Sequence, residues 1–232
     1  MSAISLLTLD LDNTLWDVES IIVKADEDMH AWLGQHYPAS QALGVSGFQA
    51  IRQQVIAERK DIAHDFTAMR LTMLEQLLLA TGYDADQART GAAGAFDVFY
   101  TGRNRVVLFD GVADTLDQLS QRFPLFALSN GNADIHRAGI GNWFKAHFSA
   151  AKVGHAKPHP RMFERALAEA GVSAHQAVHI GDHPEQDVAA AQAVGMRAIW
   201  FNPQRAAWPL ADKPDAEVHA LADLAEVITS LN

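Results

Sequence analysis

The chain contains no cysteine among its 232 residues, which excludes disulfide bonds and thiolate metal ligands. It also lacks an apolar run of the roughly 18 residues that a membrane-spanning helix needs. Basic residues are few, 18 against 28 acidic ones, and the formal net charge is −10. Because such an acidic chain is a poor binder of nucleic acid and of anionic membranes, we expect neither as a partner.

No basic segment followed by an apolar stretch stands at the N-terminus, so we expect no signal peptide. The absence of cysteine is typical of a protein in the reducing cytoplasm, which is the location that we predict. Hydrophobic residues make up 49% of the chain, which is enough to build a sizeable core in one large domain or two modest ones.

The most informative segment is residues 6–15, which read LLTLDLDNTL. The apolar run over residues 4–9 predicts a short buried strand, and the carboxylates of Asp10 and Asp12 follow it. Side chains two positions apart on an extended chain point the same way, so both can face one cavity. Their charges repel, and a hard divalent cation, Mg²⁺ for preference, would let both stay ionised. Taken alone, the segment also fits an acidic turn or helix cap.

The rest of the chain divides into a helical part and an alternating part. Residues 16–105 predict a small all-α module of four helices: one that stops near residue 36, then 47–59, 67–80 and 84–100. Later helices are predicted at 114–122, 134–140, 161–170, 185–194 and 221–230, with strands at 123–128, 177–180, 197–201 and 216–219 and a weak strand or loop at 148–153. Because strands alternate with helices, we predict an α/β fold, a Rossmann-like three-layer core with a parallel sheet, carrying the inserted helical module.

Polar residues follow the predicted strands, or precede a helix, in four places. They are Asp10 with Asp12, Ser129 with Asn130, Lys157, and Asp182 with Asp187. Each group by itself is ordinary turn or helix-cap chemistry. In a parallel sheet, however, the carboxyl ends of all strands lie at one edge, where ligands bind, so the four groups can converge.

This pattern resembles the haloacid dehalogenase superfamily of phosphotransferases, over nearly the whole chain. The four motifs of the superfamily match Asp10, Asp12 and Thr14 (DxDx[TV]), Ser129, Lys157, and Asp182 with Asp187 (GDxxxxD). The helical insert is similar to the type 1 cap of the superfamily. The resemblance therefore implies a catalytic core of residues 1–15 and 106–232 and a helical cap of residues 16–105.

The resemblance also implies a role for each matched residue. Asp10 would be the nucleophile that forms an aspartyl-phosphate, and Asp12 would protonate the leaving oxygen and later deprotonate water. Mg²⁺ would be held by Asp10, by the backbone carbonyl of Asp12 and by Asp182. Ser129, Asn130 and Lys157 would bind the phosphate. Around them, Asp187 would act through a metal-bound water or by holding Lys157, and Thr14 would orient Asp10.

Three alternatives use related chemistry. Dehalogenases of the superfamily have no second carboxylate and need no metal, whereas Asp12 is present here. A phospho-receiver switch would keep its acyl-phosphate, and the helical module and Asp12 argue against it. A phosphomutase would share the chemistry but respond to a sugar bisphosphate. Repeated release of phosphate from p-nitrophenyl phosphate separates a phosphatase from a switch.

The substrate that we expect is a small phosphate monoester chosen by the cap, with Trp16 and Arg70 as candidate specificity residues. Trp16 could pack against an aromatic leaving group, and Arg70 could supply charge. The turn 129–132, the GDHPEQD motif and the HDFTAMR stretch are similar to bacterial phosphatases of flavin biosynthesis. That narrower resemblance implies FMN or a ribitylaminouracil phosphate as the substrate.

Overall fold

The computed structural model describes residues 3–231, and the chain separates into two compact units. Unit 1 consists of Met1–Asp17 and Val107–Asn232, and unit 2 is Val18–Val106. These divisions fall beside the ones expected from the sequence, and the role of unit 2 as a cap stays a prediction.

Unit 1 is built on a six-stranded parallel sheet with the order β3-β2-β1-β4-β5-β6. The strands are β1 (Leu6–Leu9), β2 (Leu125–Ser129), β3 (Phe144–Ser149), β4 (Ala177–Gly181), β5 (Arg197–Phe201) and β6 (Ala216–Val218). The central strands β1, β2 and β4 are buried along their whole length, as expected of strands covered on both faces. The predicted α/β fold with a parallel sheet is therefore confirmed.

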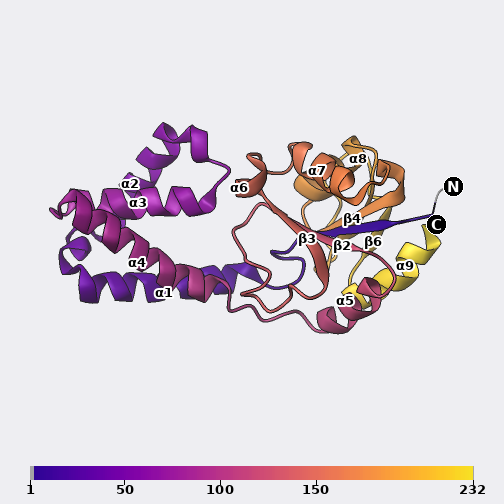
Figure 1. Cartoon of the computed structure of the whole chain (residues 1–232), viewed down its shortest axis with the longest axis horizontal. Coiled ribbons are helices and arrows are strands. Elements are labelled where there is room, and N and C mark those ends of the chain that lie inside the picture. Colours follow the sequence, from indigo (N-terminus) through magenta and orange to yellow (C-terminus); the bar gives the residue numbers. More distant parts are fainter. Residues whose placement is uncertain (1–2, 232) are drawn as a thin grey trace. The chain divides into compact units, whose positions relative to one another are not determined.

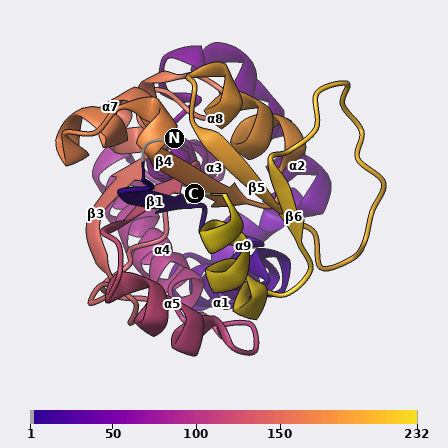
Figure 2. The same ribbon diagram turned by 90° about the vertical axis from the view of Figure 1, so that its right-hand side faces the viewer.

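Helices cover both faces of this sheet. They are α5 (Val112–Ser120), α6 (Ala150–Val153), α7 (Arg161–Ala170), α8 (Ala190–Ala193) and α9 (Leu224–Ser230), with short 3-10 turns η3 (Ala174–Gln176) and η5 (Leu221–Asp223) and a π-helical turn η4 (Pro184–Ala189). Helices α7 and α8 lie on one face, and α5 and α9 on the other (Figure 2). A large apolar cluster fills the space under α7, and Leu6, Phe126 and Phe163 belong to it. Since Leu6, Thr8 and Asp10 alternate along β1, all three point to the α7 face.

Unit 2 is a bundle of four helices, as predicted (Figure 1). They are α1 (Val18–His36), α2 (Gly44–Glu58), α3 (Phe66–Ala80) and α4 (Ala85–Arg103), with 3-10 turns η1 (Pro38–Leu43) and η2 (Lys60–Ile62). The side chains of Asp65 and Asp84 cap the N-termini of α3 and α4. Buried apolar residues such as Met29, Leu74 and Phe99 form its core. No helix within residues 3–231 is long and apolar enough to cross a membrane.

Two predicted elements are wrong. Residues 134–140 form turns and not a helix, because Asp134 accepts from the backbone of His136 and Arg137 and Gly139, at φ 78°, ends the coil after about one turn. The weak strand or loop expected at 148–153 is instead the end of β3 followed by α6. There Ser149 leaves the strand and caps the helix through Lys152 N–H.

Candidate active site

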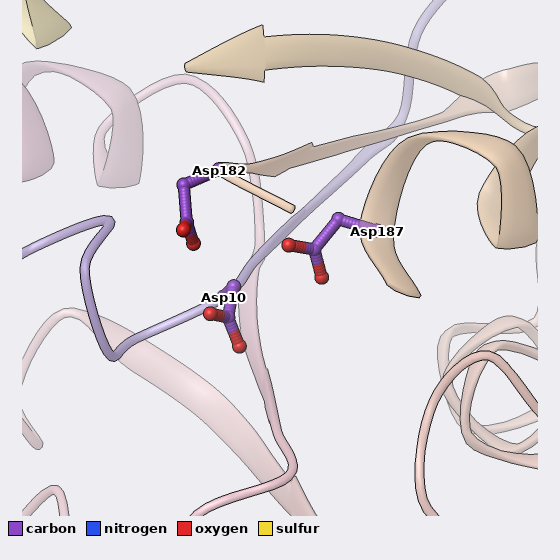
Figure 3. Close-up of side chains that lie close together, drawn as sticks. All are labelled: Asp10, Asp182 and Asp187. Carbon is purple, nitrogen blue, oxygen red and sulfur yellow. The ribbon is translucent and has the colours of Figure 1, made fainter. Parts of the chain in front are cut away.

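Strand register brings three carboxylates together at the carboxyl edge of the sheet. Asp10 follows β1 and Asp182 follows β4, and these strands pair in parallel with Leu9 beside Ile180. Asp187 reaches the same place from η4. One oxygen from each of Asp10, Asp182 and Asp187 lies within 4.8 Å of the others, and the three side chains lie close together (Figure 3). We call these three residues the carboxylate cluster.

Lys157 is the cation of this cluster. Its buried ammonium donates to Asp10 Oδ1 at 2.7 Å, to Asp187 Oδ1 at 2.5 Å and to the carbonyl oxygen of Leu128 at 2.9 Å. Burial opposes the charge of the ammonium, but the two carboxylates outweigh it and raise the pKa of Lys157 above its ordinary value. The lysine therefore stays charged, and it ties Asp10 to Asp187.

Asp187 is held by donors on both of its oxygens. Oδ2 accepts from the backbone N–H of His183 at 2.9 Å, and Oδ1 accepts from Lys157 and from Nε2 of His179, which lies 3.2 Å away. Burial alone would favour protonation, but the charge of Lys157 and these hydrogen bonds hold the pKa of Asp187 below its ordinary value. Gly181 leaves the room for this carboxylate, because a Cβ there would lie 2.3 Å from Asp187 Cγ.

The protein stabilises the negative charges of Asp10 and Asp182 less well than that of Asp187. Burial raises the pKa of Asp182 to about 6, and the neighbouring charge of Asp187 adds to the effect. Burial also raises the pKa of Asp10 well above its ordinary value, against the opposing charge of Lys157. Thr14, which we expected to orient Asp10, donates its hydroxyl to Asp182 Oδ1 at 3.1 Å instead. A cation between Asp10 and Asp182 would complete the charge balance.

The turn after β2 supports the lysine loop. Asn130 Oδ1 accepts from the Lys157 N–H at 2.7 Å, and its Nδ2 donates to the Lys157 carbonyl at 2.9 Å and to Gln186 Oε1 at 2.8 Å. Ser129 Oγ accepts from the Gly131 N–H at 2.9 Å. The Asn130 side chain therefore fixes the backbone of Lys157 with two hydrogen bonds. Phosphate binding by Ser129 and Asn130 stays a prediction.

Asp12 lies in the turn just beyond Asp10. Its Oδ1 accepts a hydrogen bond from the indole N–H of Trp16 at 2.9 Å. We expected Trp16 to pack against an aromatic leaving group and did not predict this bond. In unit 2, the guanidinium of Arg70 pairs with Asp26 and lies 3.5 Å above the centre of the Phe99 ring. These contacts engage both candidate specificity residues within their own units, and their contact with a substrate stays a prediction.

Sequence reasoning passed over three residues behind the cluster. His179 contacts Asp187, Thr8 contacts His179, and the indole N–H of Trp200 donates to the backbone carbonyl of Asp182 at 2.8 Å. The sequence does mark two of these residues by their polarity. Thr8 interrupts an apolar strand two residues before Asp10, and His179 interrupts another three residues before Asp182. Only the strand register shows that they adjoin.

Together these features define an α/β protein whose sheet carries carboxylates and a buried lysine at its carboxyl edge. The sequence matches the family of haloacid dehalogenase-like hydrolases over residues 4–195. The chain therefore belongs to this family, as its motifs predict.

The proteins that resemble this chain are named for different activities. The chain is 32% identical, over 98% of both sequences, to the 5-amino-6-(5-phospho-D-ribitylamino)uracil phosphatase YigB of Escherichia coli K12. It is 28% identical to a phosphoserine phosphatase of Thermus thermophilus over 72% of this chain and 68% of that one. Among solved structures, one titled 2-haloacid dehalogenase, from Pseudomonas syringae pv. tomato DC3000, has 41% identity and a TM-score of 0.96, covering 99% of this chain and 100% of that one.

Proposed function

We propose that this hydrolase is a Mg²⁺-dependent phosphatase that cleaves a small phosphate monoester through an aspartyl-phosphate on Asp10. The observation that carries the proposal is the contact of the buried Lys157 ammonium with Asp10 Oδ1, beside two further carboxylates. A lysine there can neutralise the phosphoryl oxygens while the adjacent carboxylate attacks phosphorus. Two relatives named as phosphatases support this reaction class.

The carboxylate cluster fits a hard divalent cation. Its donors are carboxylate oxygens, which Mg²⁺ prefers. Burial and the neighbouring carboxylates raise the pKa values of Asp10 and Asp182, and a cation bound there would favour their charged forms. Both oxygens of Asp187 already accept hydrogen bonds, which favours Asp10, Asp182 and the Asp12 carbonyl as ligands. When bound there, Mg²⁺ supplies positive charge for the phosphoryl oxygens.

The chain then performs the reaction in two displacements. A carboxylate oxygen of Asp10 attacks phosphorus as the bond to the ester oxygen breaks, and Asp12 gives that oxygen a proton. Asp12, now a carboxylate, takes a proton from water, whose oxygen attacks phosphorus and releases inorganic phosphate and free Asp10. Lys157 holds Asp10 in place throughout the reaction, and the Trp16 indole holds Asp12 in place.

Dehalogenation is the second candidate, because a similar solved structure carries that name. Halide leaves without needing a proton, so that reaction has no use for an acid at Asp12. It also has no use for three clustered carboxylates, which would repel the carboxylate of a haloacid. Asp12 and the cluster therefore favour phosphate ester hydrolysis.

For the substrate, we propose FMN or a pyrimidine phosphate of flavin biosynthesis, selected by unit 2 acting as a cap. The full-length similarity to the ribitylaminouracil phosphatase supports this choice. Because Lys157 and Mg²⁺ would contact only the phosphate end of a substrate, selection of the rest falls to other residues, with Trp16 and Arg70 as candidates.

A panel of esters with Mg²⁺ tests both levels of the proposal. We expect phosphate release from p-nitrophenyl phosphate, with higher kcat/KM for FMN and ribitylaminouracil phosphate than for simple sugar phosphates, and no halide release from 2-chloropropionate. Halide release without phosphate release would overturn the phosphatase assignment. A preference for sugar phosphates would overturn only the flavin assignment, and activity that requires a sugar bisphosphate would indicate a mutase.

A further inference from the structure

Two polar side chains meet inside the sheet, behind the carboxylate cluster. Thr8 of β1 and His179 of β4 lie opposite each other in the paired strands. Thr8 is 0% exposed and His179 is 1% exposed. Thr8 Oγ1 lies 2.7 Å from His179 Nδ1, and His179 Nε2 lies 3.2 Å from Asp187 Oδ1. The ring of Phe163 packs edge-on against the imidazole with 5.0 Å between ring centres. A continuous chain of contacts thus runs from β1 to Asp187.

The chemistry of these groups sets the direction of the chain. A carboxylate only accepts hydrogen bonds, so Nε2 of His179 must carry the proton and donate it to Asp187. Burial lowers the pKa of His179, which leaves the ring neutral and Nδ1 without a proton. The Thr8 hydroxyl is then the donor to Nδ1, so the order of donation is Thr8, His179, Asp187.

We infer that Thr8 and His179 are positioning residues for the reaction proposed above. Asp187 Oδ1 accepts from His179 and from Lys157, and Lys157 in turn donates to Asp10. The histidine fixes the rotation of the Asp187 carboxylate, and this carboxylate fixes the ammonium that faces Asp10. Neither Thr8 nor His179 touches the reacting atoms, so each acts through Asp187. The inference rests on the proposed function, because it assigns these residues to that reaction.

Matched substitutions separate positioning from packing. Thr8→Val keeps the shape and removes the hydroxyl, whereas Thr8→Ser keeps the hydroxyl and removes a methyl group. His179→Gln keeps an N–H donor that can reach Asp187, whereas His179→Leu keeps only apolar bulk. A positioning role predicts that the Ser and Gln variants keep more activity than the Val and Leu variants, and a packing role predicts the reverse order.

We expect kcat for p-nitrophenyl phosphate with Mg²⁺ to fall about tenfold in Thr8→Val, within the range known for supporting residues of metal sites. KM should change less than twofold, and Thr8→Ser should stay within threefold of the parent kcat. A readout free of activity is the tautomer of His179, measured by ¹⁵N NMR of the imidazole with His179→Gln used to assign the signal. We expect the Nε2–H form in the parent protein, because Asp187 accepts that proton.

The outcomes separate this inference from the function beneath it. If the parent protein releases no phosphate from any ester, the proposed function fails and the positioning role fails with it, whatever the tautomer. If the parent protein is active but Thr8→Val keeps as much kcat as Thr8→Ser, or His179 carries its proton on Nδ1, the positioning role alone is overturned. The Thr8→Val and Thr8→Ser variants should have thermal unfolding midpoints within a few degrees of each other. A difference in activity between them then does not come from unfolding.

Discussion

The indole N–H of Trp16 donates a hydrogen bond to Oδ1 of Asp12 over 2.9 Å. The two residues are four apart, and the chain between them turns at Asn13, which has φ 60°, in the left-handed region that asparagine tolerates better than most residues. This bond holds one oxygen of the Asp12 carboxylate in a fixed position. A buried aromatic side chain thus orients the proposed acid and base.

Removal of that donor is expected to slow the chemistry more than it weakens substrate binding. Trp16→Phe keeps a large ring and loses the N–H, and we expect kcat to fall about tenfold, the ~1.4 kcal/mol typical of one hydrogen bond to a charged group. Steady-state kinetics with p-nitrophenyl phosphate checks this, with Trp143→Phe as the control. An unchanged kcat in Trp16→Phe would show that Asp12 is oriented without the indole.

Replacement of the nucleophile should abolish turnover and leave the fold intact. In Asp10→Asn the side-chain oxygen can still accept from the Lys157 ammonium, and one buried charge is removed. We expect activity below a few per cent of the parent value and a thermal midpoint at least as high. Retention of more than a few per cent of activity, with the Asp10→Asn substitution verified by mass spectrometry in the variant, would contradict Asp10 as the nucleophile.

Metal removal should stop the reaction and lower stability together. We expect EDTA to abolish phosphate release and added Mg²⁺ to restore it. Binding to the folded state should also raise stability, by about 2.7 kcal/mol at a Mg²⁺ concentration one hundred times its Kd. Differential scanning calorimetry with and without Mg²⁺ measures this gain.

A pair of variants at the same loop identifies the metal ligand. Asp182→Asn should lose both the stabilisation by Mg²⁺ and the activity, because it removes a charged oxygen of the cluster. Glu185→Gln changes an exposed carboxylate three residues away and should keep both. Equal stabilisation of the two variants by Mg²⁺ would exclude Asp182 as a ligand.

His147 on β3 is expected to make stability depend on pH. Burial, with the nearby charge of Lys152, lowers the pKa of His147 to about 4, and its Nε2 is buried without a hydrogen-bond partner. The unfolded chain takes up a proton near pH 6.5 and the folded chain does not. The contribution of His147 to stability is therefore largest above pH 6.5 and falls as the pH drops toward 4.

Urea unfolding at intervals from pH 7 to pH 4 measures this dependence. His147→Leu should flatten the curve because it removes the titrating group, whereas the control His136→Asn, at an exposed neighbour, should keep its slope. Parallel curves for His147→Leu and the parent protein would assign the acid sensitivity to other groups.

Some local features were predictable from the sequence because they depend on neighbours along the chain. The apolar run before Asp10 predicts β1, and helical periodicity predicts the four helices of unit 2. Helix α7 matches its predicted range, 161–170, because a strongly amphipathic segment ends at Gly171, which adopts φ 66°. The prediction failed at 134–140, where a local side-chain bond of Asp134 competes with the helix.

The sequence by itself determined the strand ends, the helical insert and the kinds of side chain available for chemistry, because spacing and polarity encode these locally. Only the tertiary structure decided which groups meet. Lys157 contacts Asp10 across 147 positions of the chain, Thr14 bonds Asp182 rather than Asp10, and Thr8 lies beside His179. These partnerships depend on the register of parallel strands, which is set by the packing of the whole sheet.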